Sequence, residues 1–328
     1  MTHDRSRISV DAWIGAGGWG YFHGPSGKNL VDYARGFGFV EVNSTFYRHP
    51  PREAVRRWRG SVPAGFRFAV KGHRSITHVH RFRATRGALA ALARDAAIAR
   101  TLDSDILVLE TPADLEFGRE ETDAIAEFAG TVGRRVRIAL EARAYAGTAL
   151  PDPLSRALND VSGIDVVDLS RGILPRVDSD ILYSRVFGKG PHNVWELSDD
   201  ELREIDAASR TTGSDRMVFA FHGVRMYKDA ARFLEFRSTG ALLPATKGQG
   251  TLAIAEALAP DARFPLTRNE LLRDHGWKVV TAEDGRNVHA SEYLARLPHR
   301  TFRSLDEALR SIPHPQAGPY ILPASPDL

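Results

Sequence analysis

Eight short apolar runs, separated by helix-like segments, constrain the fold of this chain more than any other feature. The runs cover residues 12–16, 39–43, 66–71, 106–110, 136–141, 164–169, 181–187 and 217–222. Helix-like segments between and after them cover 29–36, 51–58, 87–101, 119–130, 152–158, 199–209 and 228–237. This alternation predicts a (β/α)8 TIM barrel. The connection 170–180 is too short for a crossover helix, so we expect the barrel to be irregular between strands six and seven.

Seven of the runs carry a polar or charged residue at or near their C-terminal end. Because side chains alternate along a strand, Glu41 and Asn43 share one face, and Glu141 lies in phase with Arg143. Buried charges need partners, water or a ligand. One explanation is a functional site at the C-terminal rim of a barrel. The other is a structural belt of ion pairs between the basic and acidic strand ends: Lys71, Arg143 and Arg185 with Glu41, Glu110, Glu141 and Asp168.

The two carboxylates of Glu41 and Glu141 suggest acid/base chemistry. Lys71 and Arg143 lie near them in the pattern and would separate their pKa values. The predicted catalytic residues are therefore Glu41, Lys71, Glu141 and Arg143. A divalent metal such as Mg²⁺, Mn²⁺ or Zn²⁺ is the alternative cofactor, with Glu110 and Asp168 as candidate ligands. No His-x-x-x-His spacing supports that alternative.

Positive charge is concentrated in one segment. The net charge is only +3, yet Arg48 to Arg86 contains eleven Lys or Arg residues and a single acid, Glu53. The arginines of the helix over 51–58 fit a solvated face equally well, whereas the loop over 72–86 favours contact with an anion. The expected ligand is a phosphorylated small molecule or single-stranded nucleic acid.

A glycine-rich string, Gly15-Ala16-Gly17-Gly18-Trp19-Gly20, follows the first run. It suits either a phosphate-binding turn or a tight turn that places Trp19 over the barrel mouth. Trp19, Phe46 and Tyr47 could instead stack on a sugar or base. The candidate substrate-binding residues are Trp19, Asn43, Phe46, Tyr47, Arg74, His78, Arg185 and His222.

The chain contains no cysteine, which excludes disulfides, thiolate zinc sites and cysteine nucleophiles. Its first residues lack the apolar stretch of a signal peptide, and no apolar run reaches membrane-spanning length. We expect a cytoplasmic protein with no membrane partner.

The character of the sequence changes after the barrel. We expect a barrel domain over 1–240, a linker over 241–262 and a small α+β accessory domain over 263–328, which has its own helix caps and turns. This tail is the expected contact for a protein partner.

Four strings resemble the domain of unknown function 72 family, also called YecE-like. They are Gly15-Ala16-Gly17-Gly18-Trp19-Gly20-Tyr21, Val40-Glu41-Val42-Asn43-Ser44-Thr45-Phe46-Tyr47-Arg48, Gly65-Phe66-Arg67-Phe68-Ala69-Val70-Lys71 with Ile76-Thr77-His78, and Ala139-Leu140-Glu141-Ala142-Arg143. The resemblance implies a TIM barrel and brings no settled activity. The chain departs from the family pattern at Glu110-Thr111-Pro112, Arg185-Val186-Phe187-Gly188 and Phe221-His222-Gly223, where the polar lining is exchanged.

The sequence therefore favours an enzyme that hydrolyses a phosphoester, with nucleic acid among the substrates. The first alternative is a non-catalytic module that binds nucleic acid or a nucleotide. The second alternative is a metal-dependent sugar-phosphate isomerase.

Overall fold

The computed structural model describes residues 11–313, which form two compact units. The first extends to Leu243 and the second begins at Pro244.

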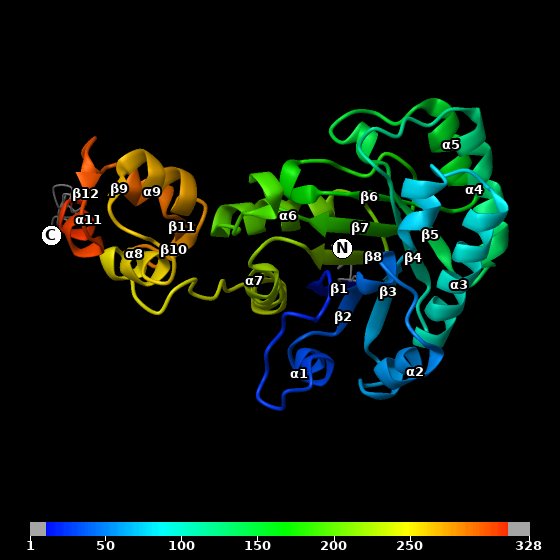
Figure 1. Ribbon diagram of the computed structural model, residues 1–328, viewed down its shortest axis with the longest axis horizontal. Coiled ribbons are helices and arrows are strands. Elements are labelled where there is room, and N and C mark those ends of the chain that lie inside the picture. Colours follow the sequence, from blue (N-terminus) through cyan, green and yellow to red (C-terminus); the bar gives the residue numbers. More distant parts are fainter. Residues whose placement is uncertain (1–10, 314–328) are drawn as a thin grey trace, which may run out of the picture. The chain divides into compact units, whose positions relative to one another are not determined.

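Eight parallel strands form a closed barrel in the first unit, with each strand paired to the next and β8 paired to β1. The predicted (β/α)8 fold is confirmed (Figure 1). The strands are β1 (Asp11–Ala16), β2 (Phe39–Val42), β3 (Arg67–Lys71), β4 (Ile106–Glu110), β5 (Arg137–Glu141), β6 (Ile164–Val167), β7 (Ile181–Val186) and β8 (Arg216–Phe221).

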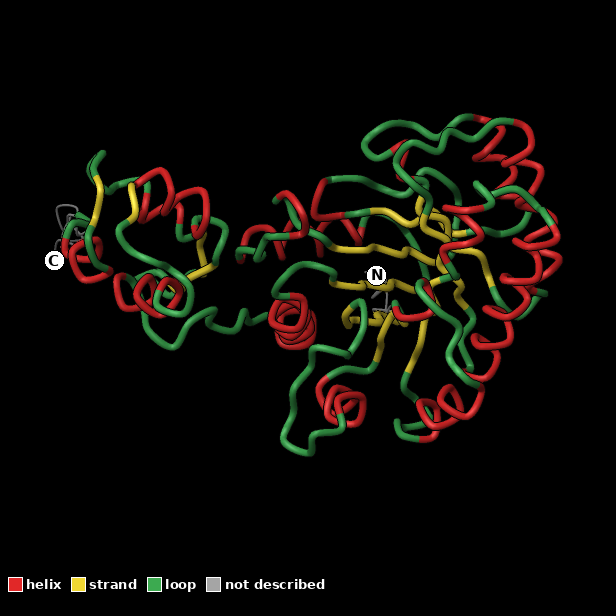
Figure 2. The backbone as a smooth tube through the Cα atoms, viewed as in Figure 1, coloured by secondary structure: helices red, strands yellow, loops and turns green. Residues whose placement is uncertain are grey.

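Helices follow seven of the eight strands of this barrel, as far as residues 11–313 show (Figure 2). The connection from β6 to β7 contains only a 3-10 turn, Leu169–Arg171, so the predicted irregularity is confirmed. The barrel helices are α1 (Asn29–Gly36), α2 (Arg52–Gly60), α3 (Arg86–Leu102), α4 (Arg119–Val132), α5 (Asp152–Asp160), α6 (Asp199–Arg210) and α7 (Met226–Thr239).

The barrel interior has its own apolar core, separate from the layer between strands and helices. Its members occupy alternate positions of each strand, as the two-residue period requires. Tyr183, Val218 and Ala220 belong to it, for example, whereas Leu182, Met217 and Phe219 pack outward against the helices. On each strand, the residue two positions after the last inward-facing apolar residue therefore points to the C-terminal rim.

The second unit, in its described part, combines four helices with two small antiparallel sheets, β10–β11 and β9–β12. Its elements are α8 (Thr251–Leu258), β9 (Leu266–Thr267), α9 (Arg268–His275), β10 (Val279–Thr281), β11 (Asn287–His289), α10 (Ser291–Leu294), β12 (Thr301–Phe302) and α11 (Leu305–Arg310).

The expected linker over 241–262 needs correction, because α8 lies inside it. Ala253, Ile254 and Leu258 form one apolar face of this helix and are buried in the core of the second unit. The apolar face, rather than the flanking Gly and Pro residues, decides where the second unit begins.

Within residues 11–313, no helix is both long enough and apolar enough to cross a membrane.

Candidate active site

The inward-facing row of almost every barrel strand ends in a polar residue at the C-terminal rim. Phe39 is followed by Glu41, Val108 by Glu110, Ala139 by Glu141, and Tyr183 by Arg185, each two positions on. The same phase brings Lys71 from β3 and His222 after β8 to this rim. Strands β2, β3, β4, β5 and β7 and the end of β8 thus supply one cluster, as in the active sites of TIM-barrel enzymes.

Arg185 is the centre of this cluster. Its Nη1 donates to Glu110 Oε2 at 2.6 Å and also to Glu141 Oε2, and its Nη2 lies 3.2 Å from Glu41 Oε1. The residue is 2% exposed. One buried guanidinium therefore contacts three carboxylates, and Glu110 and Glu141 are neighbours because they accept from the same nitrogen.

Two more cations complete the charge balance. Lys71 Nζ donates to Glu110 Oε2 at 2.7 Å, and Arg143 Nη1 lies 3.5 Å from Glu110 Oε1. The Arg143 side chain is 47% exposed, whereas those of Glu110 and Glu141 are 12% and 17% exposed. Solvent, and hence a ligand, reaches the cluster from the side of Glu110, Glu141 and Arg143.

Glu41 forms the floor of the cluster and is fully buried. Tyr183 donates its hydroxyl proton to Glu41 Oε2 at 2.8 Å, and His222 Nε2 lies 3.4 Å from Glu41 Oε1. Asn43 donates to the carbonyl of Gly17 at 2.8 Å and lies 3.4 Å from the His222 ring. Glu41 and Glu141 thus both contact Arg185, and the partly exposed neighbour of Glu141 is Glu110.

The pKa values of the two accessible carboxyls move in opposite directions. Burial raises the pKa of Glu141, and the charge of Glu110 adds to that effect although Arg185 opposes it. Burial would also raise the pKa of Glu110, but Arg185 and Lys71 outweigh it and lower the pKa to about 2. A pair of carboxyls separated in this way contains one group that keeps its proton to a higher pH than the other.

Burial and neighbouring charges also shift the pKa values of the groups below the pair. Burial opposes ionisation of Glu41, yet Arg185 and His222 hold its pKa well below the usual range. Burial, aided by Arg185, lowers the pKa of His222 to about 4, so its ring is neutral near pH 7. Burial and Arg185 lower the pKa of Lys71, while Glu110 acts in the opposite direction.

The aromatic candidates divide between the mouth and its surroundings. Lys71 Nζ lies 4.1 Å from the centre of the Phe46 ring, and His78 contacts the same ring edge-on at 5.1 Å. Tyr47 is 70% exposed. Trp19 contacts Trp58 of α2 at 5.2 Å.

Close packing explains two glycines of the string after β1. A Cβ on Gly17 would lie 2.1 Å from His222 Cε1, and a Cβ on Gly15 would lie 2.0 Å from the carbonyl oxygen of Phe39. These glycines let the rim and neighbouring strand approach the backbone, which supports the tight-turn interpretation.

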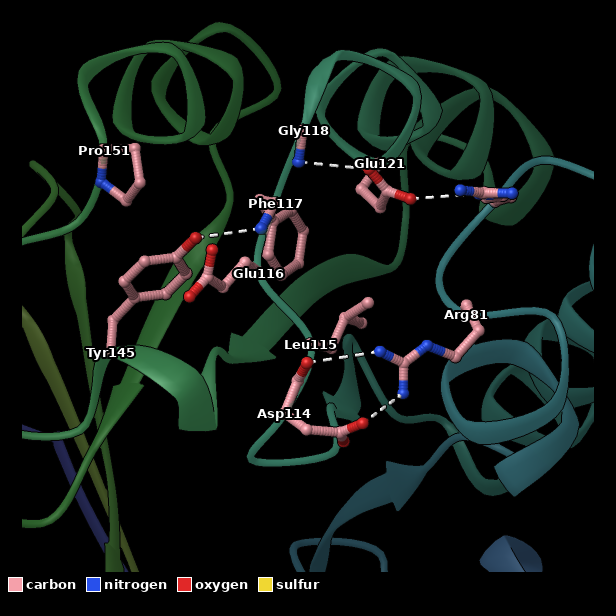
Figure 3. A pocket seen from close by; sticks show the side chains of 10 residues that line it. Arg81, Asp114, Leu115, Glu116, Phe117, Gly118, Glu121, Tyr145 and Pro151 are labelled. Carbon is pink, nitrogen blue, oxygen red and sulfur yellow. Dashed lines mark hydrogen bonds and ion pairs between the residues drawn. The ribbon is translucent and has the colours of Figure 1, made fainter.

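The basic loop after β3 is only partly available to an anion. Arg81 donates to the Asp114 carboxylate at 2.9 Å, and Arg83 donates to Glu121 at 3.0 Å. Figure 3 shows the Arg81 guanidinium directed at Asp114 across a pocket of the β4–α4 loop. Arg74 is exposed and has no ion pair within the described residues.

The two candidate metal ligands have other partners. Glu110 contacts Lys71, Arg185 and Arg143, whereas Asp168 accepts from the backbone and hydroxyl of Ser170. Burial raises the pKa of Asp168 to about 6. Between residues 11 and 313, no group of three or more His, Asp or Glu side chains is arranged to hold a metal ion.

Sequence reasoning missed Tyr183 as a site residue, and it considered Glu110 only as a candidate metal ligand or as part of a belt of ion pairs. The signal for Tyr183 is its phase, because it precedes Arg185 by two positions on β7. The contact between Arg185 and Glu110 joins strands that are not neighbours, so no local pattern predicts it.

A closed (β/α)8 barrel with an ionic cluster inside its C-terminal rim defines the molecule as a TIM-barrel protein. Within that class, the chain belongs to the family described as "Protein of unknown function DUF72", whose model matches residues 13–245.

Individual relatives agree with this assignment. The "UPF0759 protein YecE" of Escherichia coli (strain K12) is 44% identical over 50 residues, which are 15% of this chain and 18% of that protein. A crystal structure of a DUF72 family protein from Enterococcus faecalis V583 aligns with a TM-score of 0.55 at 14% identity, covering 70% of this chain and 98% of that one. One from Thermotoga maritima MSB8 gives 0.55 at 16% identity, covering 70% and 99%. At these identities the two structures show a shared fold.

Proposed function

We propose that the chain is an enzyme that uses the carboxyl pair Glu110 and Glu141 for general acid/base hydrolysis of a phosphoester. The observation that carries this proposal is the shared Arg185 Nη1, which places the two carboxyls side by side while their pKa values move apart. Opposed pKa values in neighbouring carboxyls are typical of acid/base assignments.

The proposed step uses one proton of the pair. Glu141 gives its proton to the leaving oxygen as the P–O bond breaks and the oxygen of a water molecule bonds to phosphorus. The proton that the water releases returns to the carboxyl pair, which regenerates the starting state. Arg143, 47% exposed at the edge of the cluster, would neutralise the phosphate oxygens.

The first test is the variant Glu141→Gln. Hydrolysis of p-nitrophenyl phosphate, a phosphomonoester, and of bis(p-nitrophenyl) phosphate, a diester, should fall by about 10²–10⁴-fold, as expected for loss of a general acid. Binding of a non-hydrolysable phosphonate should remain. The control is Glu53→Gln on α2, an exposed carboxylate outside the cluster.

The pH profile provides a second test. Because the pKa of Glu141 is raised, its proton is present at low pH and is lost as pH rises through that raised value. The kcat of the wild-type chain should therefore fall on the alkaline side, and the Glu141→Gln variant should lack that limb. An unchanged profile in the variant would contradict the assignment of Glu141.

A non-catalytic nucleic-acid module is the second candidate, because Arg48, Arg74 and Arg94 are exposed and have no ion pair within residues 11–313. Salt-dependent binding without turnover of any phosphoester would favour it over the enzyme.

A further inference from the structure

A basic hollow lies outside the ionic cluster around Arg185, between α3 and the loops that follow β2 and β3. Its volume is about 540 Å³. Two arginines, three histidines and a hydroxyl contribute to its wall: Arg48, His49, His73, Ser75, His80 and Arg94. The sequence pattern alone does not bring Arg48, His49 and Arg94 together, because α3 lies far from β2 along the chain.

The two central histidines are fixed from below by a buried carboxylate. Asp95 is 0% exposed, and its Oδ1 lies 2.9 Å from His49 Nε2. Its Oδ2 accepts from the backbone N–H of His73 at 2.8 Å. The His49 and His73 rings stack at 4.6 Å. The negative charge of Asp95 is therefore satisfied inside the protein and does not face the hollow.

Small residues on α3 keep the hollow open. A Cβ on Gly87 would lie 2.5 Å from His80 Nε2, so the His80 ring occupies space that only glycine leaves free. Ala90 and Ala91 line the same wall. The wall belongs to the first turns of a helix of 17 residues, and the dipole there favours negative charge.

The cations at the edge of the hollow differ from those of the neighbouring loop. Arg81 and Arg83 are paired with carboxylates, whereas Arg48 and Arg94 are exposed and form no ion pair in the described part of the chain. Exposed arginines beside fixed histidines and a hydroxyl match the hydrogen-bonding needs of a phosphate group.

Two chain segments connect this hollow to the barrel mouth. Phe46 contacts Lys71 in the mouth, and the next residues, Tyr47 to His49, line the hollow. The turn Ser75–Val79 likewise carries Ser75 in the hollow and His78 against Phe46. The hollow and the mouth are therefore formed in part by the same two segments, those that follow β2 and β3.

We propose that this hollow is a phosphate-binding subsite that holds the backbone of single-stranded nucleic acid while the mouth acts on another phosphate of the same strand. The part of this proposal that concerns the mouth rests on the proposed function. The affinity of the hollow for phosphate is independent of that function.

The experiment adds a carboxylate to the wall and leaves its polar side chains in place. Ala90→Glu places the new carboxylate in the hollow, and Ala97→Glu, exposed further along the same helix, is the matched control. A second variant combines Arg48→Ala with Arg94→Ala. Fluorescence anisotropy measures binding of a dinucleotide and of an oligothymidylate of about 12 nucleotides over a salt series.

We expect Ala90→Glu and the double arginine variant to weaken binding of the longer strand by about tenfold. The slope of log affinity against log salt should become shallower by about 0.7 for each phosphate that the variant no longer neutralises. Hydrolysis of p-nitrophenyl phosphate should not change. Equal binding by Ala90→Glu and Ala97→Glu would overturn the subsite. If inorganic phosphate binds the wild type but not Ala90→Glu, and affinity does not increase with strand length, the proposal of a polymeric ligand is wrong.

The two proposals fail separately. If wild type hydrolyses no phosphoester but Ala90→Glu still weakens strand binding, the subsite is supported and the enzyme is not. If Glu141→Gln abolishes turnover while Ala90→Glu changes nothing, the enzyme is supported and the subsite is wrong.

Discussion

Arg185 determines the electrostatics of the rim at the level of a single residue. Its planar guanidinium donates to Glu110 and Glu141 and faces Glu41, a geometry that the single ammonium of a lysine cannot reproduce. The three carboxylates in turn raise the pKa of Arg185 well above its ordinary value, although burial acts against them. The cluster is therefore interdependent, and removal of its centre leaves buried charges without compensation.

We expect Arg185→Met to reduce the free energy of unfolding by about 3–5 kcal/mol at neutral pH. In the native protein Glu110 has a lowered pKa, so its stabilising contribution is present above its unfolded pKa and is lost as pH falls toward about 2. Without Arg185 that contribution is smaller, because Lys71 remains to lower the pKa of Glu110. The difference between variant and wild type should consequently shrink as pH falls below the unfolded pKa of the carboxyls.

Urea denaturation at neutral pH and at about pH 3 measures this change. Arg185→Lys retains the charge and should lose less stability than Arg185→Met. A difference that is independent of pH would contradict the assigned role of the ion pairs.

Tyr183 stabilises the floor of the cluster through one hydroxyl. It donates to the fully buried Glu41 at 2.8 Å, so Tyr183→Phe should destabilise the protein by about 1–3 kcal/mol, the cost of leaving a buried acceptor unsatisfied. Thermal denaturation measures the loss. Tyr47→Phe removes a hydroxyl from a side chain that is 70% exposed and should change little. Equal melting of the two variants would show that the contact is not stabilising.

At the scale of the elements, alternation was the most informative property of the sequence. It predicts all eight strands, and it predicts that Glu41, Lys71, Glu141 and Arg185 point toward the rim, where the structure brings them together. It could not predict which charges pair, because Arg185 on β7 reaches Glu110 on β4 across the barrel. Arg81 and Arg83 appeared available to an anion for the same reason, since Asp114 and Glu121 lie on another part of the chain.

The packing of α7 near the start of α6 depends on a buried carboxyl. Asp229 on α7 accepts from the backbone N–H of Leu197 at 3.3 Å and lies 3.7 Å from Arg232. Burial, with the charge of Glu196 adding to it, raises the pKa of Asp229 to about 8. The folded protein therefore binds a proton here that the unfolded chain has already released above its ordinary carboxyl pKa.

A raised carboxyl pKa makes the contribution of Asp229 to stability fall as pH rises from about 4 to about 8. Asp229→Asn keeps the acceptor for Leu197 and removes the titration. We expect the variant to equal wild type near pH 4 and to melt at a higher temperature at about pH 8.5, where each pKa unit is worth about 1.4 kcal/mol. Calorimetry at both pH values measures this. Parallel curves for the two proteins would show that Asp229 does not titrate as described.

At the scale of the whole molecule, the two units have separate apolar cores. The barrel core has no member beyond Phe233 among the buried residues that the structure describes, and the core of the second unit begins at Ala253. Every residue of the ionic cluster around Arg185 and of the basic hollow belongs to the first unit. The sequence predicted this division from caps and turns, but it placed the start of the second unit too late because α8 lacks a strong cap.

A chain that ends at Leu243 should therefore fold and retain any hydrolytic activity. The cut lies at the boundary between the units, and it keeps α7 with its Gly240 cap and Leu242, which packs against the barrel core. We expect kcat and the melting transition of the barrel to match those of the full chain, whereas binding of a proposed protein partner of the tail would disappear. Circular dichroism, calorimetry and p-nitrophenyl phosphate turnover measure these properties. The control ends at Phe233 and removes the last turns of α7, so it should destabilise the barrel. Loss of turnover in an intact barrel ending at Leu243 would mean that a residue of the second unit takes part in the proposed reaction.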